Sequence, residues 1–271
     1  MGNVTLTGGA PEIADVVAVA RGGATVEVAD AARAAMTKSA ALVEGFVESG
    51  QPVYGVTTGF GSLATRFIPA ERTAELQVSL VRSHAAGMGD PVEREVVRAM
   101  LFLRARSLSM AHSGVRPDVV DLQVALLNAG ITPVVREHGS LGASGDLAPL
   151  AHCALPLIGE GTVFTADGSV QAAVHALADA GLTPLTLRAK EGLALINGTD
   201  GILGMLCLAL HDLGQLGRLA DLTAAMTVEG LLGTDRAFAA ELQALRPRVG
   251  QAVSARNLPR LLADSAIVAS H

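Results

Sequence analysis

Apolar residues recur every three or four positions along most of this 271-residue chain, which is the pattern of amphipathic helices. One such stripe begins near Glu71, a second follows Pro91, and a third lies at residues 119–129. The longest run, from Ile202 to Ala220, keeps the same spacing and predicts a long helix in a bundle. We interpret the methionine and leucine stripes as core. The predicted fold class is therefore mainly α.

Short strand signals accompany the helical ones in the first third of the chain. Apolar and polar residues alternate at positions 4–6 and again at 26–28, which indicates two short strands. Asp30 is placed to cap a following helix, and Gly50 is placed to end it. We therefore expect a mixed α/β lobe at residues 1–110.

The rest of the chain, residues 111–271, is expected to form a helical lobe that contains the start of the bundle. It also carries an extended segment from Ile131 and a hairpin signal with Asp167–Gly168 at the turn. The boundary near residue 110 is soft, because no Pro/Ser-rich linker or low-complexity tract marks it. Residues 257–271 keep their apolar periodicity without a glycine cap or a polar tail, so we expect the bundle to continue beyond them.

Composition narrows the class of protein further. Hydrophobic residues make up 50% of the chain and charged residues 17%, a balance that argues against disorder. Aromatic residues make up only 3% and Trp does not occur, so an aliphatic, Ala-rich core of closely packed helices is expected. The net charge is −6 and no Lys/Arg-rich block occurs, so we expect neither a nucleic-acid-binding surface nor an anionic-membrane surface.

Cysteine usage and the start of the chain indicate a reduced, cytoplasmic, globular protein. Cys153 and Cys207 lie far apart and outside any CxxC pattern, and the histidines show no HExxH or similar spacing, so we expect neither a disulfide nor a metal site. The first residues, MGNVTLTGG, lack the basic and apolar regions of a signal peptide. The best membrane candidate, from Leu193 to Leu210, is interrupted by polar residues and is better interpreted as a buried helix.

The segment HGSLGASGDLAPL, residues 138–150, concentrates glycines just before a predicted helix. Gly139, Gly142 and Gly145 give GxxGxxG rather than the GxGxxG of dinucleotide-binding loops. A hydrolase elbow needs GxSxG, but Asp146 stands where its second glycine would be. By itself the cluster is compatible with a tight turn that starts a helix.

Ala143, Ser144 and Gly145 can also form an electrophile from the backbone itself. In a sharp bend the Gly145 nitrogen can attack the Ala143 carbonyl, because glycine has no side chain to obstruct the approach. Loss of water closes a five-membered ring, and loss of the Ser144 hydroxyl as a second water leaves an exocyclic methylidene. The segment closely resembles the part of the histidine and aromatic amino acid ammonia-lyases that forms methylidene-imidazolone (MIO).

The resemblance extends through essentially the whole chain and implies roles for further residues. VYGVTTGFG is similar to the family's tyrosine loop and implies that Tyr54 is an acid/base group. EGLALINGTDG is similar to the family's asparagine segment and implies that Asn197 hydrogen-bonds the MIO or the substrate. SLVRSHAAGMG places His84 where the histidine-specific members carry a histidine, which implies contact with a substrate imidazole.

The resemblance implies elimination of ammonia from L-histidine to give urocanate. No neighbouring carbonyl acidifies the β-proton removed in that reaction, and an MIO electrophile would supply the electron sink that ordinary side chains lack. Gly142 and Asp146 are expected to support MIO formation, although Asp146 can equally be a plain helix-start residue. The alternative activities are a phenylalanine or tyrosine ammonia-lyase, or an aminomutase, with the same MIO. His84 disfavours these alternatives.

The resemblance also implies an assembly larger than this chain. Family members are homotetramers whose active sites combine residues from several subunits, and they are considerably longer than 271 residues. An arginine that holds the substrate carboxylate belongs to the part of those chains that follows SAIVASH. An alternative of a different class is therefore a catalytically silent folding module. Apolar helix faces left uncovered would drive association of the chain.

Overall fold

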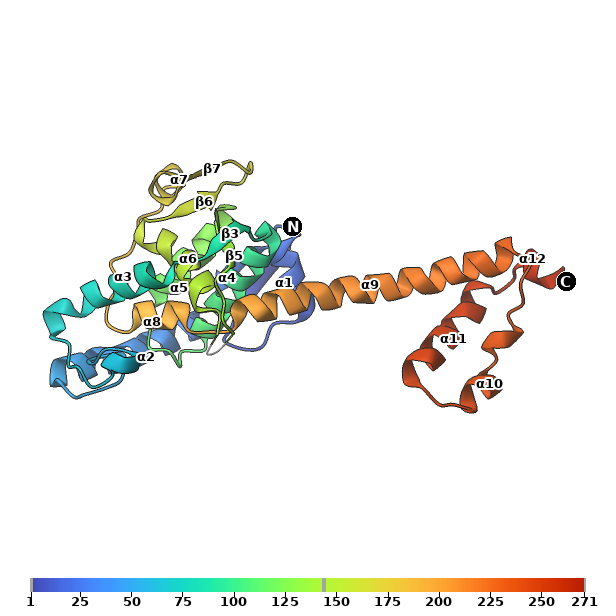
Figure 1. The fold of residues 1–271 in the computed structure, drawn as a ribbon, viewed down its shortest axis with the longest axis horizontal. Coiled ribbons are helices and arrows are strands. Elements are labelled where there is room, and N and C mark those ends of the chain that lie inside the picture. Colours follow the sequence, from blue (N-terminus) through green and yellow to red (C-terminus); the bar gives the residue numbers. More distant parts are fainter. Residues whose placement is uncertain (1, 143–144, 271) are drawn as a thin grey trace. The chain divides into compact units, whose positions relative to one another are not determined.

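The computed structural model describes residues 2–142 and 145–270, which divide into two compact units. The first unit extends to Leu208 and the second begins at Ala209. Helices predominate in both units, which confirms the prediction of a mainly α fold (Figure 1).

The first unit alternates helices with short strands. Its helices are α1 (Ile13–Ala20), α2 (Asp30–Ser49), α3 (Thr73–His84), α4 (Arg94–Ser109), α5 (Pro117–Asn128), α6 (Leu147–Ala154), α7 (Ala173–Asp179) and α8 (Glu191–Ile196). Its strands are β1 (Asn3–Leu6), β2 (Thr25–Val28), β3 (Met88–Pro91), β4 (Thr132–Pro133), β5 (Arg136–His138), β6 (Thr162–Phe164) and β7 (Val170–Ala172). Helix α9 (Asp200–Gly230) contributes residues to both units, and α10 (Ala240–Ala244), α11 (Val249–Leu261) and α12 (Ala266–Ala269) follow in the second.

Helix α4 forms the centre of the first unit. Every residue from Ala99 to Ala105 is buried, so this helix has no solvent-facing side over nearly two turns. Helices α1, α2, α5 and α6 pack against it, and α5 runs beside it in green in Figure 1. A helix that is apolar on all sides is stable only inside a core. Each large aliphatic or aromatic side chain buried here contributes roughly 1.5–3 kcal/mol relative to exposure.

Strands β1, β2, β6 and β7 lie where the sequence predicted strands, and β4 lies in the predicted extended segment from Ile131, whereas β3 was not predicted. Strands β1 and β2 pair in parallel from Asn3↔Thr25 to Leu6↔Val28, and β6 and β7 form the antiparallel hairpin predicted around Asp167–Gly168. Gly50 ends α2 in the left-handed conformation with φ 64°, as predicted. The prediction that Asp30 caps α2 is wrong, because Ala29 is the cap residue and Asp30 is the first helical residue. At that position a carboxylate still interacts favourably with the helix dipole.

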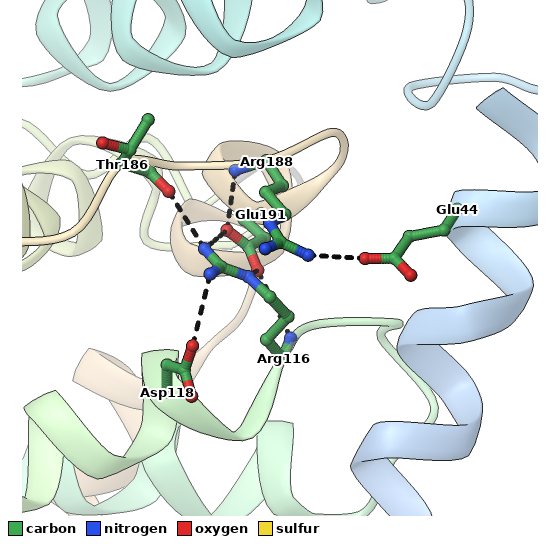
Figure 2. Close-up of polar contacts among 6 residues, drawn as sticks. All are labelled: Glu44, Arg116, Asp118, Thr186, Arg188 and Glu191. Carbon is green, nitrogen blue, oxygen red and sulfur yellow. Dashed lines mark hydrogen bonds and ion pairs between the residues drawn. The ribbon is translucent and has the colours of Figure 1, made fainter. Parts of the chain in front are cut away.

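A buried ion pair fixes the first residue of α8. The Glu191 side chain is almost fully buried and accepts hydrogen bonds from Arg116 Nε and Nη2 at 2.8 and 2.9 Å. The Arg188 backbone N–H donates to the same carboxylate at 2.7 Å. Figure 2 shows the surrounding network, which comprises Glu44, Arg116, Asp118, Thr186, Arg188 and Glu191. Bidentate pairing of this kind holds the start of α8 in one position.

The segment at residues 191–230 is long and apolar enough to cross a membrane by length and composition, because it contains an 18-residue stretch with mean hydropathy 1.7. The structure interrupts this segment, because α8 ends at Ile196 and α9 begins at Asp200. Asp200 is buried and paired with an arginine. These features argue against a continuous membrane span. The prediction of a buried helix from Leu193 to Leu210 holds only in part, because Ile202, Met205 and Leu206 are exposed.

The second unit has little core of its own. Its buried cluster consists of Ala225, Leu258 and Leu262. The α9 residues of this unit instead expose large apolar side chains, between 44% and 63% accessible, namely Leu213, Leu216, Leu219, Leu222 and Met226. The interpretation of the methionine and leucine stripes as core is therefore wrong for this part of α9. These side chains stay exposed among the described residues, so the expectation of uncovered apolar helix faces is met here.

Candidate active site

The glycine-rich loop makes a close backbone contact with the turn between α8 and α9. Gly145 has φ +131°, a conformation that residues with a side chain rarely adopt, and a Cβ placed on it would lie 2.3 Å from the Gly198 carbonyl oxygen. The next residue, Asp146, donates its backbone N–H to that same oxygen at 2.7 Å. Position 145 therefore requires glycine for both conformation and space. Ala143 and Ser144, the other two predicted ring-forming residues, lie outside the described residues.

The Asp146 carboxylate links the loop to α9. It is 2% exposed, and its Oδ1 accepts a hydrogen bond from Ser140 Oγ at 2.8 Å. Its Oδ2 accepts the backbone N–H of Ile202 at 2.9 Å, one of the N-terminal amides of α9 that have no partner within the helix. Asp146 occupies the cap position of α6 but makes no side-chain cap bond there. Its carboxylate therefore bridges the loop and a second helix, which goes beyond starting α6.

The turn from Asn197 to Asp200 rests on a buried arginine of α4. Arg104 Nη1 donates to the Asn197 carbonyl oxygen at 3.1 Å and to Asp200 Oδ2 at 2.9 Å. Ser107 Oγ donates to the other oxygen of Asp200 at 3.3 Å. Burial raises the pKa of the Asp200 carboxyl, and the charge of Arg104 opposes that rise. Asn197 itself is exposed at the end of α8.

His84 stands at the end of α3, on a segment that contacts the start of the glycine-rich loop. Its Nδ1 lies 2.9 Å from the Leu80 carbonyl oxygen, which can only accept, so Nδ1 donates this hydrogen bond. Three residues later, the Gly87 N–H donates to His152 Nε2 of α6 at 3.0 Å. A Cβ on Gly139 would lie only 3.2 Å from the Gly87 Cα. The chain after His84 therefore packs directly on the loop and on α6.

His152 serves this packing as a hydrogen-bond acceptor. Accepting the Gly87 N–H requires an unprotonated Nε2, so the bond needs the neutral imidazole. Burial lowers the pKa of His152, and the charge of Arg136 lowers it further. The neutral form is thus the stable one at this position.

Tyr54 lies in the segment that follows α2. It is 57% exposed, its hydroxyl accepts the Gly61 N–H at 3.2 Å, and its ring meets Phe60 edge-on with centroids 6.4 Å apart. A Cβ on neighbouring Gly55 would lie 2.6 Å from a methyl carbon of Leu193. The Tyr54 segment therefore packs on α8, the helix that ends at Asn197.

The described residues bring some of the predicted site residues into direct contact and leave others apart. Gly145 and Asp146 contact Gly198, the neighbour of Asn197. Among the described residues, Tyr54 and His84 make no hydrogen bond to that group. Sequence reasoning missed Arg104, Asp200 and Gly198. One usable signal was present for Arg104, since an arginine within the apolar run AMLFLRA indicates a buried ion pair.

The two cysteines and the candidate metal ligands were also located in the described part of the chain. No group of three or more His, Cys, Asp or Glu side chains is placed there to hold a metal ion. Cys153 and Cys207 are free and buried, and burial raises the pKa of both thiols. A thiol held in this protonated state is a poor nucleophile.

Comparison with known proteins relates this arrangement to a sequence family. The family model described as aromatic amino acid lyase matches residues 12–271. A histidine ammonia-lyase from Streptomyces avermitilis is 56% identical over 257 residues, which cover 95% of this chain and 50% of that protein. The chain spans about half the length of the curated relatives it matches.

Solved structures share the fold of nearly the whole chain. A tyrosine aminomutase from Streptomyces globisporus is similar with a TM-score of 0.90 at 39% identity, over 96% of this chain and 49% of that one. A histidine ammonia-lyase from Trypanosoma cruzi is similar with a TM-score of 0.88 at 38% identity, over 95% of this chain and 50% of that one. Each similarity again covers about half of the solved chain.

Proposed function

This chain belongs to the aromatic amino acid lyase family, and we propose on that premise that it is part of a histidine ammonia-lyase. The reaction is the non-oxidative elimination of ammonia from L-histidine to give urocanate. The relative from Streptomyces avermitilis, at 56% identity, supports histidine as the substrate, and so does His84. The observation that carries the proposal is the contact of Gly145 with Gly198 in a loop of the order Ala-Ser-Gly-Asp.

The residues around Gly145 fit an MIO formed from Ala143, Ser144 and Gly145. The left-handed φ and the 2.3 Å approach leave space at position 145 for a residue without a Cβ and for no other. The Asp146 N–H, held on the Gly198 carbonyl, anchors the chain directly after the proposed ring. When formed, the MIO supplies an electrophile that side chains cannot provide.

Ring formation needs two dehydrations and no oxidant. The Gly145 nitrogen bonds to the Ala143 carbonyl carbon, and the carbonyl oxygen leaves as water with the protons of the Gly145 and Ser144 amides. The Ser144 hydroxyl then leaves as a second water with the Ser144 α-proton, which creates the methylidene double bond. The chain loses two water molecules in total. Gly142, with φ 66°, supports this proposal because it lets the loop turn just before the ring residues.

The predicted site residues have separate roles in binding the substrate and in proton transfer. His84 would hold the substrate imidazole through its Nε2, since its Nδ1 is bonded to the Leu80 carbonyl, and Asn197 would hydrogen-bond the substrate or the MIO. Tyr54 is the acid/base candidate. An unperturbed tyrosine has a pKa of about 10, so the completed site must favour the phenolate for proton abstraction. The Gly61 N–H already donates a hydrogen bond to the Tyr54 hydroxyl oxygen.

The proposal extends to the cellular setting. Histidine degradation, a cytoplasmic location and a homotetramer are the corresponding expectations for the full-length enzyme. The exposed leucines of α9 support assembly, because apolar patches of this kind mark interaction surfaces. The half of the relatives' length that this chain does not span would supply the rest of the site.

Two activity measurements test the proposal. Urocanate formation by the chain, above that of Ser144→Ala, would exclude the silent folding module. The second assay adds the C-terminal half of the Streptomyces avermitilis relative and compares L-histidine with L-tyrosine and L-phenylalanine as substrates. Preference for L-histidine supports the proposal, whereas conversion of L-tyrosine or L-phenylalanine instead would favour the related lyase or aminomutase. No activity toward any of them would contradict the lyase assignment.

A further inference from the structure

Arg104 and Asp200 form an ion pair in the core of the first unit. The two residues are 5% and 4% exposed, and Arg104 Nη1 lies 2.9 Å from Asp200 Oδ2. Burying two charges costs desolvation that their attraction rarely repays in full, and apolar residues of similar volume are often more stabilising. Stability alone therefore does not explain a charged pair in the apolar centre of α4.

The pair is tightly enclosed by the turn that follows α8. Arg104 Nη1 donates both to the Asn197 carbonyl and to Asp200, so one guanidinium nitrogen binds the first and last residues of the turn. A Cβ on Gly198 would lie 2.0 Å from that nitrogen and 2.4 Å from Asp200 Oδ2. The backbone of Gly198 is thus packed directly on the ion pair.

The opposite side of the same residue contacts the glycine-rich loop. The Gly198 carbonyl oxygen accepts the Asp146 N–H at 2.7 Å and occupies the space that a Cβ of Gly145 would need. A continuous series of contacts therefore runs from the ion pair through Gly198 to Gly145. At the other end of this series, the Asp146 carboxylate accepts a hydrogen bond from the Ile202 N–H of α9.

We infer that Arg104 and Asp200 are positioning residues for ring formation, acting through Gly198. The pair holds the Gly198 carbonyl against Gly145 and Asp146 and so fixes the backbone whose nitrogen is the proposed nucleophile. Neither side chain gives up or takes a proton in the two dehydrations. This inference rests on the proposed function, because it concerns formation of the proposed electrophile.

The first experiment measures the intact mass of four purified chains: wild type, Arg104→Met, Asp200→Asn and Glu191→Gln. Glu191→Gln is the matched control, because it weakens another ion pair with a buried carboxylate, at the other end of α8 (Figure 2). We expect wild type and Glu191→Gln to lose two water molecules and the Arg104 and Asp200 variants to keep the encoded mass. Thermal melts of all four chains report whether each variant folds.

The second experiment does not depend on ring formation. In a Ser144→Ala background, where the ring cannot form, hydrogen exchange of the Asp146 amide is measured with and without Asp200→Asn, with Glu191→Gln as control. We expect Asp200→Asn to speed exchange of that amide about tenfold or more and to leave the amides of α5 unchanged. The asparagine in Asp200→Asn has nearly the size of aspartate and keeps one acceptor oxygen, so of the two pair variants this one is best suited to retain the fold.

The outcomes separate the inference from the proposed function. Normal processing of both pair variants, unchanged Asp146 exchange, or equal loss of processing in Glu191→Gln would each overturn the positioning role. An unprocessed wild type would contradict ring formation by this chain alone, and the Asp146 amide would still decide whether the pair holds Gly198 in place.

Discussion

The two units of the chain bury their apolar residues to very different degrees. In the first unit, α4 is enclosed on all sides, and the glycine-rich loop is fixed to it through the Asn197–Asp200 turn. In the second, α9 exposes a row of leucines and the buried cluster has three members. The first unit therefore supplies its own core and a fixed backbone site. The second supplies a surface that needs a partner to become buried.

The largest contrast in stability should appear on truncating one leucine in each unit. Leu126 of α5 is fully buried, and Leu126→Ala should lower the free energy of unfolding by about 2–5 kcal/mol. Leu216 of α9 is 59% exposed, and Leu216→Ala should change it by less than about 0.5 kcal/mol. Urea unfolding of both variants measures the difference. Equal losses would show that Leu216 is buried in solution.

Gly145→Ala should have the next largest effect. The new Cβ meets the Gly198 oxygen and the left-handed φ is strained, so we expect a loss of roughly 1–3 kcal/mol in unfolding free energy and no ring. Gly181→Ala is the matched control, because Gly181 has φ +68° with no atom near its would-be Cβ. Gly181→Ala should lower the unfolding free energy only by the conformational strain and should leave the two-water mass deficit unchanged. Ring formation in Gly145→Ala would show that the contact with Gly198 is dispensable.

Local pattern explains which of these features could be predicted from sequence. Steps of three and four located α9, and alternation located β1, β2 and the β6–β7 hairpin, because such elements are set by neighbouring residues. The order Ala-Ser-Gly-Asp located the candidate site through its resemblance to a family. The pairing of Arg104 with Asp200 joins residues 96 positions apart, and no local pattern encodes it. The apolar spacing of the α9 leucines does not reveal whether another part of the fold covers them, so periodicity alone misassigned them to the core.

A change in association should follow from altering the exposed face of α9. Replacing Leu213, Leu216 and Leu219 together by Gln should shift the chain from oligomers toward monomer in sedimentation velocity. Because these side chains are solvated in the isolated chain, its unfolding free energy should change little. A wild-type chain that sediments as a monodisperse monomer would refute the role of this face in association.

The smallest effect expected is a pH dependence from His152. Its folded-state pKa is lowered by burial and by Arg136, so the unfolded chain binds the proton more readily. Stability from the neutral imidazole is present above the ordinary pKa of about 6.5 and is lost as pH falls from there through the lowered folded-state pKa. In His152→Gln the melting temperature should depend less on pH over this interval than it does in the wild type. His175→Gln, at an exposed position, should not.

The intact mass of the purified wild-type chain, compared with Ser144→Ala, tests most directly whether the first unit forms its own electrophile. A deficit of two water molecules in the wild type, located by peptide mapping to residues 143–145 and absent from Ser144→Ala, is the predicted result. The encoded mass in a folded wild-type chain would contradict it.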